Sequence, residues 1–244
     1  MAEGASFDFT GRRVVVTGGT SGIGAAIAAG FLQAGAEVIV TGRRDGGAGY
    51  GEAPAGADYR TLRLGERDTI ARLVGSLDRL DVLVNNAGGT TVPEDFDAAV
   101  DENLKGVHAL TLGCLPLLAA SAQRGGGAVV SIASLMAVFG NSIFPGYSAA
   151  KAGLLLMTRS LAQSWGAKGV RLNVVAPGPV RTPMTARYAD DPVYGPGTAQ
   201  RMALARWGTP EDIAGPVLFL AGPAAAFVTG DCLIASGGYM IAEA

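Results

Sequence analysis

The stretch RVVVTGGTSGIG, residues 13–24, carries the strongest indication of architecture in this 244-residue chain. Its β-branched first part, Arg13 to Thr17, is typical of a buried strand. The alanine-rich segment from Ile23 to Ala34 has the composition of a helix. The glycines from Gly18 to Gly24 lie between the two and allow a tight turn. A second apolar run, Val38 to Thr41, follows, so the region predicts a β-α-β unit with a right-handed crossover.

Strand and helix patterns continue to alternate along the chain. Further strands are expected at Val82–Val84, Ala128–Ile132, Arg171–Val175 and Cys232–Ile234, and further helices at Tyr147–Trp165 and Glu211–Leu220. The strands are continuously apolar, without the polar alternation of a sheet that faces water, so helices should cover both faces. The pattern predicts an α/β fold, with a doubly wound parallel sheet of about seven strands in a three-layer sandwich.

Two segments lack a regular pattern. Residues 46–57 are rich in Gly, Ala and Pro and predict a loop. Residues 177–208 are rich in proline and predict a long crossover, with a substrate lid at about residues 180–208. The length suits one domain spanning residues 1–244, because sheets of this class often run this long.

Composition argues against several function classes. The 19 basic and 21 acidic residues give a net charge of −2, which provides no positive field for a nucleic-acid backbone. No apolar stretch approaches the roughly 20 residues that span a bilayer, and the N-terminus lacks the pattern of a signal peptide. Cys114 and Cys232 cannot form a disulfide framework, and the single His108 excludes a multi-histidine metal site. We therefore expect a cytoplasmic protein with no membrane partner, no nucleic-acid partner and no metal.

The glycine-rich turn suits a phosphate group. Glycines let the backbone approach a ligand closely, and the start of the next helix offers unpaired N–H groups and the positive end of its dipole. The glycines stand at 18, 22 and 24, so their spacing differs from the usual G-x-G-x-x-G. An ordinary tight turn is the alternative interpretation, because the chain contains 37 glycines.

Tyr147 and Lys151 are spaced as neighbours on one face of a helix. Free tyrosine, with a pKa of about 10, is a poor acid or base at neutral pH. A cation within roughly 4–6 Å lowers the pKa of an acid by about 1–3. Tyr147 could then exchange a proton with an alcohol or ketone oxygen. The alternative is a surface tyrosine beside a solvated lysine.

Over essentially its whole length, the chain resembles the short-chain dehydrogenase/reductase family. The family's cofactor motif matches residues within Thr17–Gly24, and its Asn-Asn-Ala-Gly signature matches Asn85 to Gly88. Its catalytic residues match Asn103, Ser134, Tyr147 and Lys151. Ser131 lies nearby, but the family's spacing of thirteen residues before the tyrosine selects Ser134. The resemblance implies a Rossmann-type fold and an oxidoreductase that transfers a hydride between a nicotinamide cofactor and a ketone or secondary alcohol.

The resemblance also implies the role of each residue. Tyr147 is the acid/base, and Lys151 lowers its pKa and binds the nicotinamide ribose. Ser134 donates a hydrogen bond to the substrate oxygen as charge develops there. Asn103 kinks its helix and holds a water of the proton relay. The residues implied in cofactor binding are Gly18, Thr20, Ser21, Gly22, Ile23, Gly24, Arg43, Arg44, Asn86, Ala87, Gly88, Tyr147, Lys151, Pro177, Gly178, Val180 and Thr182.

The residues after the second strand predict which cofactor binds. NAD-dependent relatives usually place an acidic residue there, which accepts a hydrogen bond from the ribose 2′-OH. This chain has Arg43 and Arg44 instead, and an arginine can pair with a 2′-phosphate. We therefore expect NADP(H), with NAD as the alternative if both arginines point to solvent. The family's usual aspartate near the adenine is also missing, since the stretch Leu62–Glu66 offers Arg63.

Two other functions stay open. The narrower one is a 3-oxoacyl-carrier-protein reductase, which needs basic residues to dock an acidic carrier. Lys168 is available for this, whereas Ala128 stands just before the fifth strand, where a basic residue would help. The other is a non-catalytic nucleotide-binding sensor or scaffold on the same fold, although such proteins usually lose the tyrosine or the lysine.

Apolar residues near the site have two interpretations. They could line a substrate pocket, or they could pack loops and subunits against each other. They are Met136, Phe139, Ile143, Phe144, Met184, Tyr188 and Tyr194. Relatives in the family are commonly tetramers, and 16% charged residues with a mean hydropathy of +0.31 agree with buried interfaces, so a homotetramer is expected.

Overall fold

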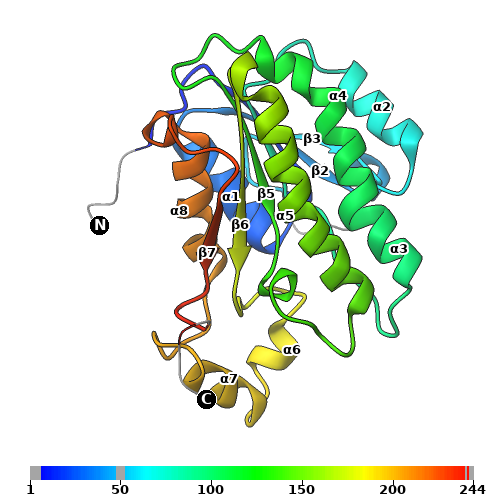
Figure 1. The fold of residues 1–244 in the computed structure, drawn as a ribbon, viewed down its shortest axis with the longest axis vertical. Helices are drawn as coiled ribbons and strands as arrows, with labels where there is room; N and C mark the ends of the chain where they lie inside the picture. Colours follow the sequence, from blue (N-terminus) through cyan, green and yellow to red (C-terminus); the bar gives the residue numbers. More distant parts are fainter. Residues whose placement is uncertain (1–6, 48–52, 240, 242–244) are drawn as a thin grey trace.

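Parallel strands form one sheet at the centre of the molecule (Figure 1). The structure is a computed structural model that describes residues 7–47, 53–239 and 241. In this part of the chain the strands are β1 Arg13–Val16, β2 Glu37–Gly42, β3 Asp58–Thr61, β4 Val82–Asn85, β5 Gly127–Ile132, β6 Val170–Pro177 and β7 Cys232–Ala235. Their order is β3-β2-β1-β4-β5-β6-β7, and each neighbouring pair is parallel. The predicted doubly wound sheet is therefore confirmed.

Helices cover both faces of the sheet. One face carries α1 Gly22–Gln33 and α8 Pro210–Ala221, and the other carries α2 Arg67–Gly75, α4 Val107–Ala119 and α5 Pro145–Trp165. The shorter helical segments are η1 Asp45–Gly47, α3 Phe96–Val100, the π-helical η2 Asp101–Gly106, η3 Leu135–Ala137, η4 Gly166–Lys168, α6 Ala186–Ala189, α7 Tyr194–Gln200 and η5 Pro223–Ala225.

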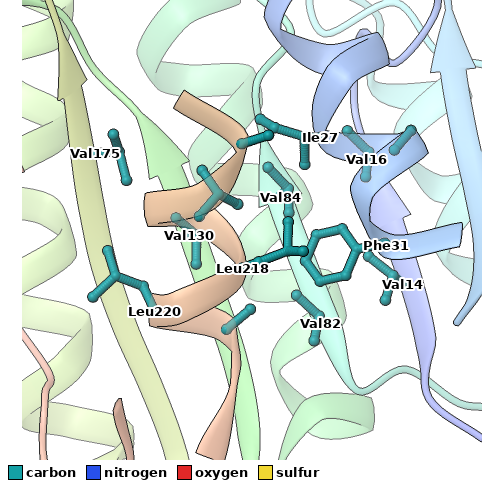
Figure 2. Packing of buried hydrophobic residues seen from close by; sticks show 14 of the residues in the cluster. Val14, Val16, Ile27, Phe31, Val82, Val84, Val130, Val175, Leu218 and Leu220 are labelled. Atoms are coloured by element: carbon teal, nitrogen blue, oxygen red, sulfur yellow. The ribbon is translucent and has the colours of Figure 1, made fainter. Parts of the chain in front are cut away.

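Successive side chains of a strand enter opposite cores. Val14 and Val16 pack into the cluster that contains Phe31 of α1 and Leu218 of α8 (Figure 2). Val15, between them, belongs to the cluster formed with α2, α4 and α5. Because both faces exclude water, an apolar residue is favoured at every position of a central strand. This explains why the strand sequences show no polar alternation.

The strand order gathers several loops at one edge of the sheet. β1 lies beside β4, so the winding of the chain reverses between these two strands. In open α/β sheets, ligands bind in the crevice at such a switch point, outside the carboxyl ends of the strands. The helices α6 and α7 lie beyond this same edge, past the ends of β6 and β7 (Figure 1).

The proline-rich segment, residues 177–208, is more regular than predicted, because it contains α6 and α7. The side-chain oxygen of Asp191 accepts hydrogen bonds from the N–H groups of Val193 (2.9 Å) and Tyr194 (2.7 Å) at the start of α7. Pro196 lies in the first turn of that helix, where its missing N–H would have had no helical partner. Local capping therefore allows α7 to form, although the Gly- and Pro-rich composition of the segment predicts a loop.

Ala128, considered above as a position where a basic residue would help to dock a carrier, lies inside the strand. It is the second residue of β5 and is fully buried, so a basic side chain there would point into the core rather than toward a carrier. The predicted loop at residues 46–57 lies partly outside the described residues, which omit 48–52. Among the helices that the structure describes, none combines the length and apolarity needed to cross a membrane.

Candidate active site

The glycine-rich loop joins β1 to α1 under tight steric constraints. Gly18 and Gly22 adopt φ values of +63° and +54°, which side chains disfavour. A Cβ on Gly24 would collide with the carbonyl oxygen of Gly18, and a Cβ on Gly19 would lie 2.6 Å from Val40. Each of these glycines is therefore required, either by its positive φ or by close packing, which argues against an ordinary turn in a glycine-rich chain.

The start of α1 fits an anionic group. Ser21 occupies the N-cap position, but its side chain makes no capping hydrogen bond, and the first turn contains no acidic residue. The first N–H groups of the helix and the positive end of its dipole thus meet no competing carboxylate. Thr182 lies against Gly22, since a Cβ on that glycine would be 3.3 Å from Thr182 Cβ. This cradle suits the pyrophosphate of a dinucleotide.

Hydrogen bonds fasten the loop after β4 to the glycine-rich loop. Thr17 Oγ1 accepts from the N–H groups of Asn86 and Ala87, both at 2.9 Å. Asn86 Nδ2 donates to the carbonyl oxygens of Thr17 (2.9 Å) and Gly18 (3.1 Å). The residues predicted to bind the cofactor from β1 and from β4 are therefore held as one unit. Thr17 is the centre of this unit, because its side chain and its carbonyl oxygen both bind the loop after β4.

Ser131 and Ser134 have different surroundings. Ser131 is buried within β5, where its hydroxyl accepts a hydrogen bond from Asn85 Nδ2 at 3.3 Å. Asn85 Nδ2 also donates to Thr111 of α4 at 2.9 Å. Ser134 lies beyond the end of β5, hydrogen-bonds to the phenol of Tyr147 and accepts from Met136 N–H at 3.1 Å. Of the two serines, it is Ser134 that contacts the tyrosine.

Tyr147 and Lys151 lie together near the start of α5. Lys151 Nζ is 5.4 Å from the centroid of the Tyr147 ring and donates to the carbonyl oxygen of Ile132 at 2.9 Å. The lysine is only 3% exposed, whereas Tyr147 keeps part of its surface open. The solvated lysine of the alternative interpretation is thus wrong.

Burial governs the electrostatics of this pair. It raises the pKa of Tyr147 to about 12, and the hydrogen bond from Ser134 acts in the opposite direction. It lowers the pKa of Lys151 to about 8. In the polypeptide alone, desolvation therefore raises the pKa of Tyr147, and the lowering by Lys151 that the sequence led us to expect is not found. The phenol is protonated at neutral pH and can act as a proton donor.

Asn103 lies in the π-helical segment η2 and is fully buried. Its Nδ2 donates to the carbonyl oxygens of Gly89 and Ala99, both at 2.8 Å, and its Oδ1 accepts from Gly89 N–H at 3.0 Å. A Cβ on Gly88 would collide with Asn103 Oδ1 and lie 3.5 Å from Lys151 Nζ. Asn103 thus joins its helix to the loop that borders Lys151.

The remaining predicted binding residues lie at the same edge. Pro177 ends β6, and Gly178 packs so closely against Ser236 that a Cβ would lie 2.7 Å from its Cα. Arg43 and Arg44 follow β2 and are exposed. Arg63, considered above at the adenine position, forms an ion pair with Asp45 at 3.0 Å instead of standing alone.

The apolar residues divide between the two interpretations. Met184 contacts the loop after β4, because a Cβ on Gly89 would lie 3.2 Å from Met184 Cε. Tyr188 and Tyr194 instead pack on each other, with ring centroids 5.7 Å apart. His108 lies on α4, in a surface pocket that Lys105 and Met157 also line. Within the described ranges, no group of three or more His, Cys, Asp or Glu side chains could hold a metal ion.

Known proteins are similar to this chain in sequence and in fold. Residues 18–240 match the family model described as Enoyl-(Acyl carrier protein) reductase. The 3-oxoacyl-[acyl-carrier-protein] reductase FabG of Thermotoga maritima is 35% identical over 248 residues, which cover 95% of this chain and 98% of that protein. The RhlG/NADP active-site complex of Pseudomonas aeruginosa has a TM-score of 0.85 at 30% identity, covering 97% of this chain and 99% of its own.

A further solved structure, a short-chain dehydrogenase/reductase family protein, has a TM-score of 0.84 at 39% identity and covers 96% of this chain and 100% of its own. These matches extend over almost the whole chain, and the motif residues meet at one edge of a doubly wound sheet. The chain therefore belongs to the short-chain dehydrogenase/reductase family of oxidoreductases.

Proposed function

We propose that this protein is an NADP(H)-dependent oxidoreductase that interconverts a ketone and a secondary alcohol, with Tyr147 as the acid/base. The observation that carries the proposal is the cluster around the phenol. Tyr147 is hydrogen-bonded to Ser134 and lies 5.4 Å, measured from its ring centroid, from the buried ammonium group of Lys151. The glycine-rich cradle at the same edge of the sheet fits the dinucleotide.

The roles of the side chains follow from their chemistry. When bound, the nicotinamide supplies or accepts the hydride. In the direction of reduction, Ser134 donates a hydrogen bond to the ketone oxygen as negative charge develops there. Tyr147 gives its proton to that oxygen, which completes the alcohol and leaves a phenolate. The ammonium group of Lys151 then stabilises the phenolate, and Asn103 holds the loop next to Lys151 in place.

NADP(H) is proposed on charge. β2 ends at Gly42 and is followed by Arg43 and Arg44, without the carboxylate that would accept a hydrogen bond from a ribose 2′-OH. The RhlG structure, named as an NADP complex, is a relative that supports the same choice. The other proposed cofactor contacts are those expected above from the loops after β1, β4 and β6. Val180 and Thr182 lie in the first residues of the proposed lid, residues 180–208.

Reduction of a 3-oxoacyl carrier-protein substrate is the second candidate, because the relatives include the 35% identical Thermotoga maritima FabG. An acidic carrier protein would need a basic docking surface. Lys168 lies on the surface with its ammonium group 4.1 Å from the Trp165 ring, but Ala128 is buried and cannot contribute. The general ketone reductase therefore stays the first choice.

We also propose a homotetramer in the cytoplasm. Large apolar side chains are exposed to solvent on α4, on α5 and around β7: Leu112, Leu156, Phe227 and Ile234. Exposed apolar residues of this number favour burial between subunits. Both cysteines are free, which supports a reducing compartment.

Replacing Tyr147→Phe should lower kcat by at least about a hundredfold, because the phenol proton is the one transferred. Binding of NADPH, followed by its fluorescence, should stay nearly unchanged. A panel of ketones, including an acetoacetyl thioester, followed at the NADPH absorbance measures turnover. Ser134→Ala and Ser131→Ala form a matched pair, of which only the first should lower kcat strongly. Full turnover by purified Tyr147→Phe enzyme would rule out the assignment.

The cofactor preference tests the arginines after β2. We expect kcat/KM to be at least about tenfold higher with NADPH than with NADH, since charge-assisted hydrogen bonds contribute about 1.5–3 kcal/mol. Arg43→Ala should lower the ratio of kcat/KM with NADPH to kcat/KM with NADH, because it raises KM for NADPH and leaves KM for NADH unchanged. Steady-state rates with both cofactors give the answer, and a preference of the wild-type enzyme for NADH would refute the charge argument.

Replacing Lys151→Met should abolish turnover and yet stabilise the fold near pH 7. The folded pKa of about 8 lies below the ordinary 10.5, so burying the charged lysine is unfavourable below pH 8, and wild-type stability rises as the pH goes from 8 toward 10. After the lost hydrogen bond is subtracted, the gain at pH 7 is about 2 kcal/mol. Urea unfolding between pH 7 and pH 10 should show this advantage shrinking as the pH rises. A variant less stable than wild type at pH 7 would contradict the prediction.

The tetramer predicts a solution mass of about four times the 24.6 kDa chain. Light scattering measures it directly. Leu156→Arg should lower the mass by placing a charge on an apolar contact, whereas Arg72→Ala on α2 serves as a surface control. A monomeric wild-type protein would disprove the assembly without affecting the proposed chemistry.

A further inference from the structure

The first turn of α5 is capped by a side chain far away in sequence. Its N-cap residue, Phe144, has no polar side chain, and Pro145 has no N–H. The next two N–H groups, those of Gly146 and Tyr147, donate to the carboxylate of Glu94 at 2.7 Å and 2.9 Å. Glu94 is thus bonded directly to the backbone of the proposed acid/base.

Glu94 is itself fixed to the loop that follows β4. Thr90 Oγ1 donates to the same carboxylate at 3.1 Å. The preceding residue, Gly89, exchanges two hydrogen bonds with the side chain of Asn103. A nearly continuous set of hydrogen bonds therefore runs from Asn103 along this loop to Tyr147.

Packing leaves the start of α5 little room to shift. A Cβ on Gly146 would lie 3.0 Å from the Cα of Phe96, so α3 and α5 touch through their backbones at this point. The neighbouring Asp95 belongs to α3, because it caps that helix by accepting from Ala98 N–H at 3.0 Å. Two adjacent carboxylates thus cap two different helices, and only Glu94 holds α5.

We infer that Glu94 is a positioning residue for catalysis, which fixes Tyr147 relative to the loop that borders the cofactor site. This inference rests on the proposed role of Tyr147. A carboxylate has two oxygens for two N–H donors, and its charge is favourable at a helix N-terminus. Glu94 acts through the backbone of Tyr147 and does not contact the reacting atoms.

The test replaces Glu94→Gln. Glutamine keeps the shape and one acceptor oxygen but turns an N–H₂ donor toward one of the two backbone donors. Because a misplacement of about 1 Å can reduce the rate a hundredfold, kcat should fall about ten- to a hundredfold. The Kd for NADPH should stay unchanged, and so should the pH midpoint of the kcat profile, since Tyr147 still transfers the proton.

Asp95→Ala is the matched control. It removes a helix cap from the next residue of the same loop and should lower thermal stability without lowering kcat. Glu94→Asp keeps the charge but shortens the reach, so it should give an intermediate kcat, and it serves the same comparison if Glu94→Gln does not fold.

Three results would overturn the inference. The first is a wild-type kcat for Glu94→Gln, or for Glu94→Asp if Glu94→Gln does not fold. The second is an equal loss of kcat in Asp95→Ala, and the third is a loss of kcat accompanied by equally weakened NADPH binding. The outcome is separable from the proposed function. If Tyr147→Phe still turns over, the proposed function fails first. If Tyr147→Phe is inactive and Glu94→Gln behaves as wild type, only the role of Glu94 fails.

Discussion

The pairing of β4 with both β1 and β5 is the constraint on which the site depends. In a parallel sheet all carboxyl ends lie at one edge, so this pairing brings the glycine-rich loop, the Asn85–Gly88 corner and Ser134 together although they are far apart in the chain. The pairing is stable only because helices cover both faces and bury the apolar strands. The position of the site residues at this edge of the sheet therefore depends on the exclusion of water from the two cores.

The site itself opposes stability. Lys151 is a buried cation that donates a hydrogen bond to the neutral carbonyl oxygen of Ile132 and lies over the ring of Tyr147. Burial also disfavours the ionised form of Tyr147. A carbonyl oxygen compensates less for a buried ammonium group than a carboxylate would. In the proposed reaction, that imbalance leaves the lysine's charge available to the phenolate of Tyr147. The burial of Lys151 lowers the free energy of unfolding, and the apolar cores offset this loss, as is common for proteins with functional sites.

Much of the fold could be predicted, because apolar strands and the first helix have strong local patterns. α2 and β3 were not predicted, because their local sequence patterns are weak. α2 is largely polar on its outer side, and β3 is a short edge strand with exposed residues. α7 contains Gly195, Pro196 and Gly197, whose composition indicates a loop, and a cap from Asp191 overrides that preference. Tertiary context decided these cases, and local propensity could not.

The motif residues of the site could likewise be placed from the sequence, because spacing and residue type carry their chemistry. Glu94 could not, since a glutamate in a loop gives no pattern and its partners lie 52 and 53 residues away. The one local clue is negative: Phe144-Pro145-Gly146 offers α5 no cap of its own. Such a helix start needs an acceptor from elsewhere.

The direction of the pKa shifts connects these features to the reaction. Because burial keeps Tyr147 protonated at neutral pH, the phenol can donate a proton, which is what the proposed ketone reduction requires. In the proposed mechanism, once the proton has left, the phenolate and the ammonium group of Lys151 become an ion pair in a site of low polarity, and each favours the charged form of the other. The same burial that raises the pKa of the phenol therefore strengthens the attraction that stabilises its conjugate base. Holding the two groups at a fixed separation on one helix face makes that compensation available without rearrangement of the chain.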